Sequence, residues 1–198
     1  AALLILGTVL IRATEEITWL GAFFTSMSAR TAGFSTFPLG DFTDGGLFIV
    51  AILMFIGASP GSTGGGIKTT TFFAMMMATY AIAANRHATA FKRTIPRDTL
   101  YKAFVVAALA MGICCVVLLL LSILEPELSM AQLLFETVSA FGTVGLSTGI
   151  TPELSAASKL LITLMMYIGR LGPLTVASML TFRELPKVHY SEEPIPIG

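Results

Sequence analysis

The chain alternates long apolar runs with short polar segments, a pattern typical of membrane-spanning helices. An uncharged run of 22 residues extends from Ala103 to Leu124, and at 1.5 Å per residue it crosses a hydrocarbon layer of roughly 30 Å. A second candidate span, from Lys159 to Thr181, is interrupted by a single arginine. A third, from Gly45 to Ala84, would be about 60 Å long as one helix, twice the bilayer core. Glycines and a proline in its middle predict two helices instead, over 45–57 and 69–84.

Composition agrees with a protein that faces lipid. Apolar residues make up 55% of the chain and charged residues 12%, and the mean hydropathy is +0.82. We therefore expect an all-α integral membrane protein. The only cysteines, Cys114 and Cys115, lie inside a predicted span as packing residues, so no disulfide, zinc site or covalent cofactor is predicted.

Two further apolar segments are too short to cross a bilayer. The first is predicted to form a helix from Thr18 to Ala29, and the second ends near Phe141. The second begins with a capping box, in which Ser129 pairs with Gln132. Each segment is followed by a short polar loop and then by a longer apolar run. This order is typical of a re-entrant pore helix, which enters the membrane and returns through a loop.

The two loops that follow these helices are near copies of one another. They read TAGFS from position 31 and TVGLS from position 143, and the same offset aligns MFIG at 54–57 with MYIG at 166–169. The sequence therefore predicts an internal duplication, with one span, pore helix, loop and span repeat over 1–98 and another over 99–198. One such loop could be an ordinary glycine-capped turn. Two such loops at the same offset are instead typical of loops that line a watery path, where non-helical backbone is tolerated inside a membrane.

The loop residues suit a dehydrated cation. Inward-pointing carbonyl oxygens can replace the water shell of an ion, and this needs a residue without a Cβ, which Gly33 and Gly145 provide. The TVG triplet also matches the start of the TVGYG filter of potassium channels. K⁺ is expected on the carbonyl groups of Thr31, Ala32, Thr143 and Val144. The predicted filter segments comprise Thr31, Ala32, Gly33, Phe34, Ser35, Thr143, Val144, Gly145, Leu146 and Ser147.

Charged residues are distributed unevenly between the polar segments. Basic residues gather in the 85–98 loop and after the last predicted span, whereas acidic residues flank both filter segments. The positive-inside rule then makes the 85–98 loop and the C-terminus cytoplasmic and turns the filters outward. An acidic outer mouth would concentrate cations. The alternative, that these are simply solvated loop charges, stays open.

TAGFS, TVGLS and GASPGSTGGGIKTTT at 57–71 resemble the Trk/Ktr/HKT superfamily of potassium transporters, and most closely its KtrB-type membrane subunits. The resemblance implies half of a pseudo-fourfold cation pore, because this chain matches the third and fourth of four pore repeats. The missing N-terminal repeats lie upstream or on a separate polypeptide, and a fragment is favoured because Ala1 begins inside an apparent helix.

The resemblance also implies function and partners. It implies potassium translocation across a bacterial cell membrane, with sodium as activator or coupling ion. The expected partners are the lipid bilayer, a second copy in a homodimer and a cytosolic ring of nucleotide-binding regulatory subunits. K⁺ and Na⁺ are then transported or coupled ions rather than cofactors.

The glycine-rich loop is expected to be an intramembrane gate beneath the filter, as in the family. It comprises Gly57, Ala58, Ser59, Pro60, Gly61, Ser62, Thr63, Gly64, Gly65, Gly66 and Lys68. The offset of the duplication pairs Arg170 with Ala58, so we predict that this arginine lies at the depth of the loop and holds it closed. A flexible surface loop and an arginine paired with a neighbouring helix are the alternatives. The roles of Arg30 and Glu136, in the filter field or as anchors, stay open, as does that of Lys68.

Other functions have weaker support. The segment from Gly61 to Thr70 lacks the glycine directly before lysine that a phosphate-binding loop requires. No HExxH motif or pair of membrane aspartates occurs, so neither an enzyme nor a nucleic-acid partner is predicted. A non-conducting structural membrane subunit and a transporter of sodium or another monovalent cation remain as alternatives.

Overall fold

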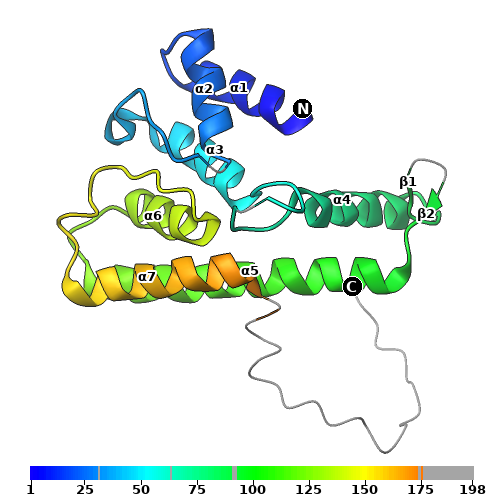
Figure 1. Cartoon of the computed structure of the whole chain (residues 1–198). Coiled ribbons are helices and arrows are strands. Elements are labelled where there is room, and N and C mark those ends of the chain that lie inside the picture. The colour runs from blue at the N-terminus through cyan, green and yellow to red at the C-terminus, as the bar shows by residue number, and fades with distance from the viewer. Residues whose placement is uncertain (31, 63, 91–92, 174, 176–198) are drawn as a thin grey trace, which may run out of the picture.

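The helix order of the first part of the chain recurs in the second part. The computed structural model describes residues 1–30, 32–62, 64–90, 93–173 and 175 (Figure 1). The first triplet contains α1 (Ala2–Thr14), α2 (Trp19–Ser28) and α3 (Asp44–Phe55), and the second contains α5 (Arg97–Leu124), α6 (Met130–Gly142) and α7 (Ala156–Leu171). The helices of each triplet pack on one another. Helix α3 begins at position 44 and α7 at position 156, which preserves the offset between the loops that begin at 31 and 143.

The long helix α5 packs against α4, α6 and α7. Its 28 residues give a length of about 42 Å, and among the described residues it is the only helix long and apolar enough to cross a membrane. Helix α4 (Thr69–Ala83) lies along its first half and α7 along its second half (Figure 1). A hairpin of β1 (Thr89–Ala90) and β2 (Arg93–Thr94) joins α4 to α5. A short helix, η1 (Leu39–Asp41), precedes α3.

Hydroxyl side chains cap the starts of α2, α3, α6 and α7, whereas α4 begins after Lys68 without a side-chain cap. Thr18, Thr43 and Ser155 each accept a hydrogen bond from a main-chain amide in the first turn of α2, α3 and α7. At α6 the predicted capping box is confirmed, because Ser129 and Gln132 each bond to the main chain of the other. These caps satisfy amide groups that have no partner within the helix.

A carboxylate reinforces the start of the last helix in each triplet. Glu15 accepts hydrogen bonds from the amide and hydroxyl of Thr43, at 3.0 and 2.7 Å. Glu125 accepts them from the Ser155 amide and the Ser158 hydroxyl, at 2.8 and 2.7 Å. Negative charge at a helix N-terminus is favourable. The offset of the loops would pair Glu15 with Glu127 and not with Glu125, so the duplication has a two-residue gap in this region.

The two triplets meet where α3 packs on α6. The rings of Phe55 and Phe141 lie 5.6 Å apart between centroids. Main chains approach closely beside them: a Cβ on Gly142 would lie 2.8 Å from the Met54 carbonyl oxygen, and one on Gly169 would overlap the Phe141 carbonyl. The end of α6 is therefore wedged between α3 and α7.

Most predicted boundaries agree with the structure, and three details differ. The overlong apolar run is broken as predicted, since α3 ends at Phe55 and α4 begins at Thr69. The last predicted span, however, is not one continuous helix, because α7 ends at Leu171 and Gly172 has a φ of 89°; residues 176–181 lie outside the described part. The 85–98 segment, expected to be a loop, contains the hairpin. Helix α5 begins at Arg97, six residues before the span predicted from Ala103, while the repeat boundary at 98/99 stays a prediction.

Candidate functional site

The first predicted filter segment leaves the carboxyl end of α2. The amides of Ala32 and Gly33 donate to the Ser28 carbonyl, at 3.0 and 3.2 Å, and the Ser28 hydroxyl donates to the Phe34 carbonyl. Gly33 has a φ of 73°, a left-handed conformation that favours glycine. The carbonyls of Ala32 and Gly33 accept no hydrogen bond from any other described residue. Thr31 lies outside the described residues.

The second predicted filter segment leaves α6 in a similar way. The amides of Thr143 and Val144 donate to the last carbonyls of the helix, each at 3.0 Å, and Gly145 has a φ of 93°. Thr143 itself has a φ of 51°, which is uncommon for a residue with a β-branched side chain. The carbonyls of Thr143 and Val144 likewise accept no hydrogen bond within the described residues.

The main chains of the two segments are in contact. A Cβ built on Gly33 would overlap the carbonyl oxygen of Val144 and would lie 3.5 Å from the Cα of Gly145. Only glycine fits at Gly33, because both the backbone conformation and the available space exclude a side chain. Two segments that are far apart in the sequence therefore lie side by side at the ends of α2 and α6.

A buried carboxylate anchors the second segment to its helix. Glu136 in α6 is 5% exposed and accepts hydrogen bonds from the hydroxyls of Ser147 and Thr151. The Ser147 hydroxyl also accepts one from the Gly149 amide, at 2.9 Å. Of the two roles left open by the sequence, this contact favours an anchor for the loop that follows Gly145.

The glycine-rich loop returns to its own starting point. The Ile67 amide donates to the Phe55 carbonyl at 3.1 Å, and the Thr69 amide donates to the Ala58 carbonyl at 3.2 Å. A Cβ on Gly57 would overlap the Gly65 carbonyl. The end of α3 and the start of α4 are thus held together beneath a compact loop, in which Thr63 lies outside the described residues.

Two hydrogen bonds connect this loop to its surroundings, and a third lies within it. The Arg30 guanidinium donates to the Gly57 carbonyl at 2.9 Å, and the Lys68 ammonium donates to the Gly64 carbonyl at 2.6 Å. The Gly65 amide donates to the Thr143 hydroxyl at 2.8 Å. The glycine-rich loop is consequently bound to residues that follow both α2 and α6.

Arg170 is arranged differently from Arg30. It is exposed at the end of α7, and no hydrogen bond or ion pair joins it to another described residue. With Gly66 and Lys68 it lines a pocket of about 220 Å³. Arg170 therefore faces the end of the glycine-rich loop across this pocket, and its role in holding the loop stays a prediction.

Sequence reasoning missed two features of this site. Arg30 anchors the loop that Arg170 was expected to hold; the signal was a guanidinium in an apolar segment, which needs partners. The contact of Thr143 with Gly65 left no signal, because it depends on the packing of α3 against α6.

The pattern G-x-S-x-G occurs at 57–61, but it follows helix α3 and not a strand, so it lacks the context of a nucleophile elbow. No cluster of metal-ligating side chains exists in the described ranges.

Known proteins resemble the chain over most of its length. The family model for TrkH, described as a cation transport protein, matches residues 1–192. The chain belongs to the TrkH family. This membership confirms the resemblance predicted from the loop motifs, and it places the chain among membrane transport proteins.

Relatives within the TrkH family include several uptake proteins. The chain is 43% identical over 181 residues to the Ktr system potassium uptake protein B of Vibrio alginolyticus, covering 91% of this chain and 40% of that protein. It is 41% identical over 177 residues to the Ktr system potassium uptake protein D of Bacillus subtilis, covering 88% and 39%. It is 36% identical over 199 residues to the potassium/sodium uptake protein NtpJ of Enterococcus hirae, covering 97% and 44%.

A solved structure shares the fold. The crystal structure of the potassium transporter TrkH from Vibrio parahaemolyticus matches with a TM-score of 0.73 at 18% identity, covering 91% of this chain and 42% of that chain. The chain therefore has a helical TrkH-like fold. It spans about two fifths of the length of the curated relatives it matches.

Proposed function

We propose that the protein containing this chain carries potassium ions across the cell membrane through a filter of main-chain carbonyl groups. The observation that carries the proposal is the contact between Gly33 and Val144, which brings two TxG segments of the sequence to one place. Two of the relatives are named potassium uptake proteins, which supports potassium as the cargo.

The proposed filter uses groups that have no other partner within the described residues. Carbonyl oxygens of Ala32, Thr143 and Val144 would replace part of the ion's water shell. Their amides are already bonded to the ends of α2 and α6. The carboxyl ends of both helices lie at these segments, where the helix dipole favours a cation. Thr31 is included because it aligns with Thr143, and further pore repeats elsewhere in the full-length protein would complete the ring.

The glycine-rich loop is proposed to be the gate of this path. Arg30 and Lys68 hold its carbonyls, and Thr143 connects it to the second filter segment. In the closed state Arg170 would add positive charge below the filter, which repels a cation. Opening would then require the loop to leave at least one of these contacts.

Potassium flux into liposomes that contain the full-length protein tests both proposals. We expect Arg30→Gln and Arg170→Ala to raise the flux several-fold, because each removes a restraint or a barrier at the gate. Arg86→Gln is the matched control, since this exposed arginine makes no side-chain hydrogen bond within the described residues and lies far along the chain from the loop. Absence of any potassium flux would favour a non-conducting structural subunit, and unchanged flux in both gate variants would refute the gate.

Sodium is the second candidate ion, favoured by the name of the relative NtpJ, a potassium/sodium uptake protein. Replacement of external sodium by choline should lower potassium uptake if sodium activates or couples transport.

We further propose outward-facing filters, a homodimer and a cytosolic nucleotide-binding ring, on the basis of the charge distribution and the Ktr relatives. Crosslinking of the 85–98 segment to a regulatory subunit in cells would test the cytoplasmic side of this segment and the presence of the ring.

A further inference from the structure

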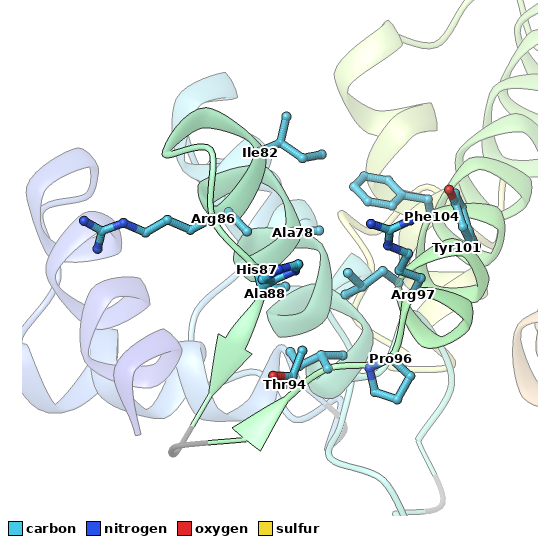
Figure 2. Close-up of a pocket in the computed structure, with 13 residues that line it drawn as sticks. Ala78, Ile82, Arg86, His87, Ala88, Thr94, Pro96, Arg97, Tyr101 and Phe104 are labelled. Carbon is cyan, nitrogen blue, oxygen red and sulfur yellow. The ribbon is translucent and has the colours of Figure 1, made fainter. Parts of the chain in front are cut away.

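A pocket opens between the end of α4 and the start of α5, far from the filter segments. It has a volume of about 400 Å³, and Thr94 of β2 is among its lining residues. His87 and Arg97 lie on its two sides, and the Arg86 side chain extends away from the α5 side (Figure 2). No aspartate or glutamate is among its lining residues in the described part of the chain.

The remaining walls of the pocket are apolar. Ile82 on α4 is 76% exposed and Tyr101 on α5 is 68% exposed, and Phe104 is also exposed. A soluble phosphate compound in this pocket would leave these apolar side chains exposed to water, because it has no apolar part to cover them. Apolar walls beside arginine instead match a ligand that has an anionic head and a hydrocarbon tail.

The position of the pocket along α5 matches a membrane interface. The uncharged run of this helix begins at Ala103, whereas the helix begins at Arg97. The six intervening residues span about 9 Å, close to the thickness of one headgroup layer. Tyr101 lies in this layer, where aromatic side chains are enriched. Arg97 would therefore lie at headgroup depth, while Ile82 and Phe104 would contact the acyl chains.

We infer that this pocket binds an anionic phospholipid, with its phosphate on Arg97 and an acyl chain along Ile82 and Phe104. Five basic residues occur between positions 86 and 102 against the single acid Asp98, so the surrounding surface also attracts anionic headgroups. Basic pockets between membrane helices bind such lipids in this way. The inference depends on the membrane location of the chain and is independent of the proposed potassium flux.

Photocrosslinking tests the site directly. The full-length protein is placed in phosphatidylcholine nanodiscs with a trace of phosphatidylglycerol that carries a diazirine on its acyl chain. We expect crosslinks on peptides from α4 and the start of α5, at a yield that Arg97→Gln lowers about fivefold, since one charge near the surface contributes about that factor. Ile82→Gln should also lower the yield, because it makes the acyl-chain wall polar.

Lys102→Gln is the matched control, because Lys102 belongs to α5 but lines a different pocket, with Thr70 and Thr99. Its yield should equal that of the unchanged protein. Equal losses for Arg97→Gln and Lys102→Gln, equal labelling by a phosphatidylcholine probe, or the absence of crosslinks at these helices would each overturn the inference. Displacement of the probe by millimolar inorganic phosphate would do so too, by identifying a site for free phosphate. All the variants replace exposed residues, so loss of folding does not confuse the result.

Discussion

At Gly33 the main chain comes closer to a neighbouring segment than a side chain would allow. The positive φ and the overlap with the Val144 carbonyl act independently, so a substitution there meets two obstacles. Gly145 has a positive φ as well, but a Cβ there would meet no atom within 4 Å. The two equivalent glycines are therefore expected to differ in their tolerance of alanine.

We predict that Gly33→Ala abolishes most potassium flux of the full-length protein, whereas Gly145→Ala lowers it less. The second variant faces only the cost of a left-handed alanine, roughly 1–2 kcal/mol; the first must also push the two segments apart. Flux in liposomes and the yield of folded protein are the measurements. Gly112→Ala in α5 is the control, since its Cβ would meet nothing within 4 Å, and equal effects of all three substitutions would contradict the prediction.

The anchoring contacts of the glycine-rich loop were only partly predictable at this scale. The roles of Gly33 and Gly145 were predictable, because TAGFS and TVGLS repeat and because inward-pointing carbonyl groups need a residue without a Cβ. The partners of Arg30 and Thr143 were not, because Gly57 is 27 residues from Arg30 and Gly65 is 78 residues from Thr143. The contact of Thr143 depends on how α3 lies on α6, and that of Arg30 on how α3 lies on α2; no local sequence pattern reports either packing.

Helix boundaries follow from local chemistry, which is why they were predicted well. The capping box at Ser129 and Gln132 and the glycines after α3 act within a few residues of the boundary that they set. The β1–β2 hairpin was not predicted, because the segment TAFKRT at 89–94 contains no Asn-Gly or Asp-Gly pair, the usual sequence signal of a two-residue hairpin turn. The ungapped offset also pairs Glu15 with Glu127, whereas the equivalent carboxylate in the structure is Glu125.

Glu125 should make the attachment of α7 depend on pH. The hydrogen bond from the Ser155 amide, followed by those from the Ser158 and Ser155 hydroxyls, lowers the pKa of this carboxyl in the folded protein. Its stabilisation is thus fully present above the pKa of the unfolded chain and is lost as the pH falls through the lowered folded value.

We predict that Glu125→Gln lowers the unfolding temperature of the full-length protein at pH 7. The difference between the two proteins should shrink as the pH falls across the acidic range. Thermal unfolding in detergent over a pH series measures this. Glu127→Gln, which changes an exposed carboxylate with no hydrogen bond to a described residue, should leave the profile unchanged, and a constant difference at all pH values would argue against the mechanism.

The chain contains two of the proposed filter segments, whereas a closed ring of carbonyls around an ion needs more. Within the described residues, α2 and α6 are the two helices that end in a TxG segment. The chain spans about two fifths of the length of its relatives, which agrees with half of a pseudo-fourfold pore.

We predict that liposomes containing the 198-residue chain alone show no potassium flux above the lipid background, while those with the full-length protein do. The physical reason is that two segments leave one side of the path open to lipid, so the ion keeps no complete coordination shell. Flux measured with a potassium-sensitive dye compares the two preparations at equal protein content. Equal flux per chain in both would show that this chain conducts by itself or as an oligomer.

The Thr143 hydroxyl belongs to the second TxG segment and also accepts a hydrogen bond from the Gly65 amide, so one oxygen atom joins the proposed filter to the proposed gate. Under the proposed function, replacing this side chain to change the preferred ion would also change the fraction of time that the gate is open. To vary the preferred ion without changing the opening of the gate, substitutions should be made at Ala32 or Leu146, whose side chains do not bond to the glycine-rich loop, and Thr143 should be kept.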